Sequence, residues 1–364
     1  MIIAYLMALI LVIPNLILQE NLIKSNMKIN TQKSGNNILI YYVLIVFVII
    51  IGLRDTASIS LDHFRQSDEL NYRNAFNLLI GSTFSLANIT SYEWARYLLD
   101  WSLANLFKHS QVWVFIYALI TNYVFIKAIN KYVQPFWFGV FLYITVGLFT
   151  FQMNGTTSVL AGAIILKSID YLIERKFLKY LFVIFLAAGI HFSAWIMVPL
   201  FFVLNKRSFS KGIIVWVLLS LFFLFNFQNI ANFLLPKTPY AYYLYQINSV
   251  NSYGVNIWRT IIFVCIYLFI ILKFKKIKDK VELDYIFINM IVVLILINII
   301  SIAYVYLYRF NELFIFSLIY MLPRVLNHFN GSIRILLYAI FTIAFIIFGL
   351  QQNWNALYEN ILLR

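Results

Sequence analysis

The sequence predicts an all-α integral membrane protein, a polytopic bundle of about 12 transmembrane helices. Hydrophobic residues make up 63% of the chain and charged residues 12%, and the mean hydropathy is +0.84. A soluble domain carries roughly 25% charged residues. We therefore expect one polytopic membrane domain over residues 1–364 and no soluble domain.

The charged residues are sorted by type between the apolar runs. All lysines except Lys108 and Lys237 fall in one alternating set of gaps or in the part of an apolar run that leads into such a gap, as the positive-inside rule predicts for cytoplasmic loops. Lysines in short loops that face an anionic leaflet explain most of the +14 net charge, so we expect membrane lipid and no nucleic acid as a partner. The opposite set of gaps holds most of the arginines: Arg54, Arg65, Arg73, Arg96, Arg259, Arg309 and Arg364. Guanidinium groups bind phosphate and carboxylate well, so this set predicts an anion-binding outer face.

Each apolar run predicts a span. Residues 1–18 have no basic start and no small-residue cleavage site after them, so they predict a retained first span rather than a signal peptide. Twelve spans with both chain ends outside place the lysine-rich gaps on one side of the membrane. The predicted spans are residues 2–19, 38–53, 110–129, 135–151, 156–173, 180–190, 193–204, 212–230, 257–272, 285–304, 312–327 and 334–350.

Two long outward segments are predicted, residues 54–109 and 231–256. Within the first, residues 92–107 are amphipathic, which predicts a helix lying along the membrane surface. The second is rich in tyrosine and asparagine. Its aromatic residues suit either a belt at the headgroup level or the packing of sugar rings.

Residues 180–204 can form one long helix or a hairpin of two short helices that turns at Gly189–His191. A single helix would place Lys206, Arg207 and Lys211 on the outer side, against the positive-inside rule, so we predict the hairpin. A turn at that depth must be buried in protein or line a watery cavity, because lipid cannot satisfy its backbone.

The first outward segment has the densest polar content, with arginines beside Asp55, Asp62, Asp68 and Glu69. Cations can hold a phosphorylated substrate while a carboxylate takes a proton from an attacking hydroxyl. A solvated loop of mutual salt bridges is the alternative. The spacing of these acids and His63 matches no defined metal motif, so we expect no metal and no cofactor.

Two further residues have both a structural and a functional interpretation. His191 is the one histidine flanked by apolar residues on both sides, and either a neighbouring hydroxyl satisfies it or it acts as a base. Arg309 follows a long apolar run. It is either an anchor that extends toward the headgroups or a functional residue that faces the bundle interior.

Three blocks of the chain carry residues of a recognisable order. The first runs Gly52-Leu53-Arg54, Gln66-Ser67-Asp68, Tyr72 and Phe76; the second contains Ser158, Ala161, Tyr171, Glu174-Arg175-Lys176, Lys179-Tyr180, Ala187, His191, Ser193-Ala194 and Pro199-Leu200; the third has Arg309 and Met321-Leu322-Pro323. Together they resemble the EpsG-like group of bacterial exopolysaccharide and O-antigen polymerases, of the broader Wzy kind. Two positions depart from that group: Gln66-Ser67 replaces Gly-Thr before Asp68, and Thr157 stands where the group has a helix arginine.

The resemblance covers roughly residues 38–327 and implies a GT-C-like polymerase in the bacterial cytoplasmic (inner) membrane, with its active site facing outward. Such an enzyme transfers glycan from an undecaprenyl-pyrophosphate donor onto a hydroxyl of an acceptor repeat unit, and a chain-length regulator is a partner left open. We expect Asp68 as the catalytic base, with His191 as the substitute. The expected substrate- and pyrophosphate-binding residues are Arg54, Arg65, Arg73, Arg96, Arg259, Arg309 and Tyr72, with Arg259 or Arg96 replacing the absent helix arginine.

Other lipid-glycan functions share these features. An O-antigen ligase or a polyprenyl-phosphate-dependent glycosyltransferase would also need outward arginines. A lipid-glycan flippase is a third alternative, but transporters often show internal repeats and ionisable residues at mid-membrane. This sequence shows no repeat, and its outward charges gather near the ends of the apolar runs.

Overall fold

The computed structural model describes residues 2–25, 32–55, 68–89, 93–206, 222, 226–234, 236, 241, 244, 255–302, 304–353 and 359–360. Its contacts divide the chain into two compact units. Unit 1 comprises Met1–Lys167, Leu186–Phe192 and Leu326–Arg364, and unit 2 comprises Ser168–Phe185 and Ser193–Val325. The prediction of a single membrane domain stays a prediction.

Unit 1 is built mainly from apolar helices, with one short pairing of two-residue strands in which Arg54 lies opposite Asn360. Its elements are α1 (Ile2–Ser25), α2 (Gln32–Gly52), β1 (Arg54–Asp55), α3 (Asp68–Leu79), α4 (Leu86–Ile89), α5 (Trp94–Phe107), α6 (Ser110–Tyr132), α7 (Phe136–Thr145), α8 (Leu148–Phe151), α9 (Thr156–Leu166), α20 (Gly331–Asn353) and β2 (Glu359–Asn360).

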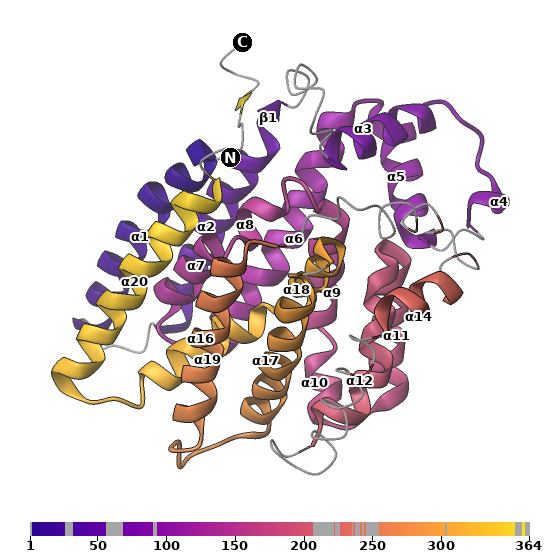
Figure 1. Cartoon of the computed structure of the whole chain (residues 1–364). Coiled ribbons are helices and arrows are strands. Elements are labelled where there is room, and N and C mark those ends of the chain that lie inside the picture. The colour runs from indigo at the N-terminus through magenta and orange to yellow at the C-terminus, as the bar shows by residue number, and fades with distance from the viewer. Residues whose placement is uncertain are drawn as a thin grey trace. The chain divides into compact units, whose positions relative to one another are not determined.

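The long helices α1, α2 and α20 lie in one layer, with α1 packed against both of the others (Figure 1). Glycine permits the close approach of α20, because a Cβ added at Gly349 would overlap the Tyr5 ring of α1. The Tyr5 hydroxyl donates a hydrogen bond to the Ile346 carbonyl oxygen, 3.2 Å away. Most of the other side chains of these helices are apolar, which suits a lipid-facing layer.

A closed network of polar side chains lies inside unit 1. The Tyr143 hydroxyl donates to Asn122 Oδ1 at 3.0 Å, and Asn122 Nδ2 donates to Gln152 Oε1 at 3.0 Å. Gln152 Nε2 completes the ring by donating to the Tyr143 oxygen at 3.1 Å. All three side chains are buried. The network ties α6 to α7 and to the residue after α8, and it leaves these amide groups paired as a buried position requires.

The predicted span 135–151 is two helices, α7 and α8, rather than one. Gly147 separates them with a φ of +98°, a conformation that glycine adopts without steric cost. A Cβ at this position would also lie 2.9 Å from the Gln352 side-chain amide nitrogen of α20. The break therefore comes from a backbone requirement that hydropathy does not register.

The amphipathic stretch 92–107 forms the predicted helix, α5. Its aromatic face packs against residues 82–85 of the same unit. Trp101 Nε1 donates to the Ser82 carbonyl oxygen at 3.1 Å, and the Phe84 ring lies 5.1 Å from Trp101 and 6.0 Å from Tyr97. Placement of α5 along the membrane surface stays a prediction.

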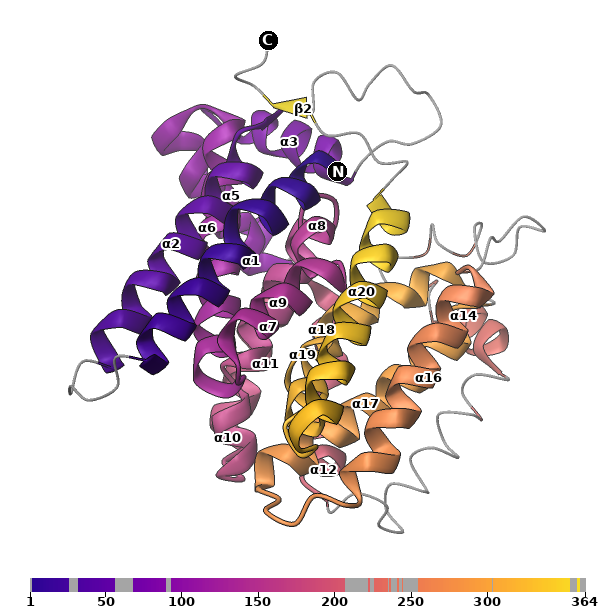
Figure 2. The same cartoon turned by 90° about the vertical axis from the view of Figure 1, so that its left-hand side faces the viewer.

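Unit 2 is also helical in its described residues, and its helices α16 and α17 lie side by side (Figure 2). Its elements are α10 (Ile169–Ile173), most of α11 (Phe177–Ile190), the 3₁₀ helices η2 (Phe192–Ile196, from residue 193 on) and η4 (Val305–Phe310), and α12 (Met197–Leu204), α14 (Phe227–Leu234), α16 (Ile257–Phe274), α17 (Glu282–Ile300), α18 (Asn311–Phe314) and α19 (Phe316–Leu326).

The hairpin predicted near residue 191 is confirmed. The Tyr180 hydroxyl on α11 donates to the Met197 carbonyl oxygen at 2.7 Å, and the rings of Phe177 and Phe201 lie 5.0 Å apart. In one continuous helix, residues 177 and 201 would be about 36 Å apart at 1.5 Å per residue. The chain therefore reverses between α11 and α12.

Every predicted span on described residues coincides with one helix or with two short consecutive helices. Five of the described helices are long and apolar enough to cross a membrane: α6, α16, α17, α20 and residues Ile2–Glu20 of α1. Six further apolar segments are shorter. The chain is thus a multi-pass helical membrane protein. The number of 12 spans stays a prediction, and span 212–230 and segment 231–256 lie largely outside the described residues.

Candidate functional site

A buried carboxylate of α3 holds two of the predicted arginines. Glu69 is 0% exposed and pairs with the Arg54 guanidinium, and its Oε1 accepts a hydrogen bond from Arg73 Nε at 2.9 Å. Arg54 and Arg73 are themselves only 3% and 8% exposed. Two guanidinium cations share one carboxylate, so these three side chains keep a formal charge of +1. The pairing of each cation with Glu69 offsets the cost of removing the charges from water.

The same arginines fix the junction of α2, α3 and α6. Arg73 Nη1 donates to Gln111 Oε1 at 2.7 Å, and its Nη2 donates to the Arg54 carbonyl oxygen at 3.2 Å. Gln111 Nε2 also donates to the Arg54 carbonyl oxygen, at 3.0 Å, and to that of Gly52. The planar fork of Arg73 thus spans three groups at once, a geometry that a lysine cannot reproduce.

Tyr72 lies one helix position from Arg73 and connects α3 to α9. Its hydroxyl shares a hydrogen bond with the Thr157 hydroxyl, 3.0 Å away, and its ring lies 6.0 Å from that of Trp113. Burial raises the pKa of Tyr72 to about 12, so the phenol is neutral at physiological pH. Thr157 is the residue at which the resemblance implies a helix arginine, and the structure places it beside the predicted substrate-binding tyrosine.

The Arg96 guanidinium lies over the Tyr72 ring. Its central carbon lies 5.5 Å from the centroid of the Tyr72 ring, within cation–π range. Arg96 also pairs with the Glu93 carboxylate, and its Nε lies 3.9 Å from Asp100 Oδ2. The Arg96 side chain is 28% exposed. Of the three predicted arginines that are described in unit 1, it is the one that an incoming anion can reach without opening a buried pair.

His191 lies at the tip of the hairpin, in the part of the chain that belongs to unit 1. Its Nδ1 lies 3.2 Å from Glu93 Oε1, and its side chain is 13% exposed. The partner is thus a carboxylate rather than the neighbouring hydroxyl of the structural interpretation. A histidine oriented by a carboxylate is an arrangement that supports proton transfer.

Asp100 connects Arg96 to helix α6. Its Oδ1 accepts hydrogen bonds from Trp113 Nε1 at 2.8 Å and from the Tyr117 hydroxyl at 2.7 Å. Burial raises the pKa of Asp100 to about 6, although these two hydrogen bonds and the Arg96 charge oppose that shift. Asp100 therefore remains mainly ionised at neutral pH and helps to hold Arg96 in place.

Asp68 is the first residue of α3 and is half-buried. Its backbone N–H donates to Asn154 Oδ1 at 3.0 Å, and its charge contributes to the raised pKa of Tyr72, after burial. The structure thus brings Tyr72, Arg96, Glu93 and His191 into one series of contacts, and Asp68 lies close enough for its charge to act on Tyr72. We call these five residues the α3–α5 cluster.

The hairpin tip depends on a glycine. A Cβ added at Gly189 would lie 2.7 Å from the Trp94 ring and 2.8 Å from the Ala95 Cβ. Replacing Gly189 with alanine is therefore expected to displace the tip from α5 and to cost about 1–3 kcal/mol of stability. Melting in detergent measures the cost, and loss of activity reports the displaced His191. An unchanged melting temperature would contradict this packing.

The remaining described arginines of the predicted set belong to unit 2. The Arg259 guanidinium hydrogen-bonds the Tyr308 hydroxyl and lies 4.3 Å from the centroid of its ring. Arg309 follows Tyr308 in η4 and is half-buried. Next to it, Asn311 Oδ1 accepts a hydrogen bond from Asn298 Nδ2 at 3.0 Å. The structure thus brings Arg259 next to the segment that carries Arg309.

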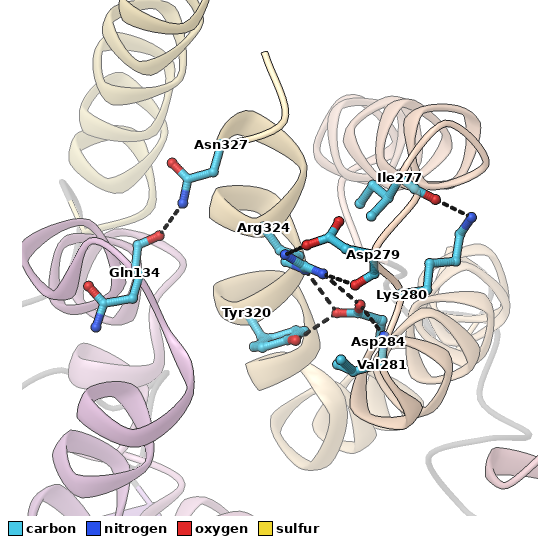
Figure 3. Close-up of polar contacts among 9 residues, drawn as sticks. All are labelled: Gln134, Ile277, Asp279, Lys280, Val281, Asp284, Tyr320, Arg324 and Asn327. Carbon is cyan, nitrogen blue, oxygen red and sulfur yellow. Dashed lines mark hydrogen bonds and ion pairs between the residues drawn. The ribbon is translucent and has the colours of Figure 1, made fainter. Parts of the chain in front are cut away.

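Another arginine of unit 2, Arg324, has a structural role. Figure 3 shows Asp284 beside Tyr320 and Arg324. The Tyr320 hydroxyl donates to Asp284 Oδ1 at 2.6 Å, and Arg324 Nη2 donates to Asp284 Oδ2 at 3.2 Å and to the Asp279 carbonyl oxygen at 2.7 Å. These bonds tie α19 to the start of α17 and to the lysine-rich loop before it.

Some residues of the predicted site and of the metal question are not among the residues that the structure describes. Arg65 lies outside the described residues, as do Asp62 and His63. Among the described residues, no group of three or more histidine, cysteine, aspartate or glutamate side chains is arranged to hold a metal ion.

The sequence predicts no role for Glu93, Asp100 or Gln111. For Glu69 it offers mutual salt bridges as an alternative, and the structure shows such bridges in a buried position. The i,i+4 spacing of Glu69 and Arg73 and the i,i+3 spacing of Glu93 and Arg96 were available as signals on a helix. The long-range partners of these acids were not.

Comparison with models of known families matches residues 37–362 to the model described as EpsG family. The match covers most of the chain and contains every predicted site residue. No curated protein and no solved structure matches the chain. The resemblance expected from the three sequence blocks is thus confirmed.

Proposed function

Because this chain belongs to the EpsG family, we propose that it polymerises lipid-linked oligosaccharide repeat units at the outer face of a bacterial cytoplasmic membrane. Family membership indicates a polysaccharide polymerase, and the apolar helices place it in a membrane. The family match is the observation that carries the proposal. The donor is proposed to be an undecaprenyl-pyrophosphate-linked glycan, and the acceptor a hydroxyl of another lipid-linked repeat unit.

The chemistry requires little from the protein. The acceptor hydroxyl attacks the anomeric carbon of the donor sugar, a new glycosidic C–O bond forms, and the C–O bond to pyrophosphate breaks. Pyrophosphate is a competent leaving group, so the protein need only neutralise the charge that develops on it and accept the proton of the hydroxyl. A single in-line displacement would invert the configuration of that carbon.

The α3–α5 cluster supports the proton-transfer part of this proposal. His191 and Asp68 are the two candidate bases of the cluster, and His191 has a carboxylate partner that can stabilise its protonated form. Tyr72 is neutral and half-buried, and it lies near Asp68 and Arg96. Its hydroxyl is proposed to contact sugar or to orient the reacting groups.

Arg96 is the arginine of unit 1 that best supports pyrophosphate binding, because it is partly exposed and lies over Tyr72. Arg96 lies over the ring of Tyr72, whose hydroxyl contacts Thr157, and this suits replacement of the helix arginine that the resemblance implies at Thr157. For Arg54 and Arg73 the buried pairing with Glu69 favours an indirect role, the positioning of α3. Arg259, Arg309 and Arg65 stay proposed as further pyrophosphate contacts.

The test is an assay of the purified full chain with a lipid-linked repeat unit. A ladder of products that grows by one repeat unit supports a polymerase. Transfer of glycan to a lipid-core acceptor without a ladder would indicate a ligase instead, and movement of the lipid across a vesicle without transfer would indicate a flippase. A parallel reaction with a polyprenyl-monophosphate donor separates the two donor classes. The proposal expects a ladder with the pyrophosphate-linked donor and none with the monophosphate-linked donor.

A further inference from the structure

One carboxylate, that of Glu93, connects the two functional side chains at the hairpin tip. Its Oε1 lies 3.2 Å from His191 Nδ1, and its Oε2 pairs with the Arg96 guanidinium. The backbone N–H of Phe192, the first residue of η2, also donates to it. Glu93 is only 7% exposed, so these contacts replace water almost completely.

The protonation state of Glu93 decides which nitrogen of His191 can act. Burial favours the neutral acid, but the His191 hydrogen bond and the Arg96 charge outweigh it and lower the pKa of Glu93. An ionised carboxylate only accepts hydrogen bonds, so His191 Nδ1 carries the hydrogen. In the neutral imidazole, Nε2 then holds the lone pair that can take a proton.

We propose that Glu93 is a positioning residue that fixes His191 in the tautomer whose Nε2 accepts the proton of the attacking hydroxyl. This inference rests on the proposed function and selects His191 over Asp68 as the base. The proton moves from the acceptor hydroxyl to Nε2 as the glycosidic bond forms, and the electron pair of the breaking bond leaves with pyrophosphate. Glu93 stabilises the imidazolium that results, through its bond to Nδ1.

Arg96 gives the arrangement a second function. It shares the Glu93 carboxylate with His191 and is held on its other side by Asp100, 3.9 Å from Nε. Glu93 thus sets the distance between the base and the arginine that is proposed to meet pyrophosphate. Loss of this carboxylate would change both the tautomer of the base and the position of the cation.

The experiment compares Glu93→Gln with wild type and with Glu174→Gln as the matched control. The Glu174 side chain is 48% exposed and pairs with Lys176, so its replacement is expected to leave the rate unchanged. Glu93→Gln is expected to lose roughly 10²–10⁴-fold in rate, as expected for loss of a correctly oriented base. Its melting temperature in detergent is measured alongside.

A double variant makes the test specific. If Glu93 acts through His191, then Glu93→Gln loses much less activity in the His191→Ala background than in the wild type, because residues that act as one unit are not additive. The loss that remains in that background reports the displaced Arg96. The inference would be overturned if the activity losses of the two single variants multiply in the double variant. It would also be overturned if the wild type forms ladders and Glu93→Gln is as active as the wild type. Absence of ladders from the wild type itself would instead reject the proposed function.

Glu93→Asp resolves the case in which Glu93→Gln does not fold. It keeps the charge but shortens the side chain by one methylene, so a folded Glu93→Asp is expected to be slower than wild type and faster than His191→Ala. Wild-type activity in this variant would overturn the inference if Glu93→Gln is unfolded. Unfolding of both variants would also overturn it, since Glu93 would then hold the fold rather than orient the base.

Discussion

Replacing His191 with alanine is expected to reduce the polymerisation rate by roughly 10²–10⁴-fold, the range that a general base contributes. The imidazole lies at the hairpin tip beside Glu93, and no other described side chain of the cluster combines a lone pair that can accept a proton with a carboxylate partner. The rate of ladder growth at saturating donor measures the effect. Asp68→Ala is expected to lose less, because the geometry favours His191 as the base.

His328 provides the matched control for this prediction. It is an exposed histidine after α19, and His328→Ala is expected to keep the wild-type rate. A larger loss in Asp68→Ala than in His191→Ala would return Asp68 to the role of base. If both variants polymerise at the wild-type rate, neither residue is the base, and the proton-transfer part of the proposal is wrong.

Replacing Glu69 with alanine is expected to destabilise the protein by about 3–5 kcal/mol, because it leaves two buried guanidinium groups without their shared anion. Glu69 is fully buried, and it pairs with both Arg54 and Arg73. Loss of this pairing should also release α3, which carries Tyr72 and Asp68. Thermal or denaturant unfolding in detergent gives the magnitude.

Glu174→Ala is the control for charge removal alone. Its ion pair with Lys176 has side chains about half exposed, and exposed pairs contribute only about 0–1 kcal/mol. The difference between the two variants therefore reports burial rather than the loss of one negative charge. Equal stabilities for Glu69→Ala and Glu174→Ala would show that the Glu69 network does not hold α3.

The residue ranges of the helices could be predicted from the sequence because each long helix depends on a continuous apolar run. Every predicted span on described residues corresponds to helical structure. The hairpin at residue 191 could be predicted as well, since lysines and arginines on each side of 180–204 constrain the direction of the chain. The break at Gly147 could not, because its positive φ reflects a local backbone requirement rather than hydropathy.

The residue types of the candidate site were also visible in the sequence, but their partners were not. The sequence predicts Asp68 as the base, His191 as its substitute and Tyr72 in a binding role. It predicts no role for Glu93, which lies 98 residues from His191 along the chain. Arg54 and Arg73 were expected to bind pyrophosphate. The structure shows both shared by Glu69 in a buried pair.

The sequence by itself determined that this is a helical membrane protein of a polymerase family, since apolar runs and ordered motifs are local properties of the chain. Only the tertiary structure decided which charges neutralise one another and which stay accessible. That difference has a physical cause: insertion of a helix depends on its own composition, whereas the role of an arginine depends on the carboxylates that folding brings within about 4 Å of it.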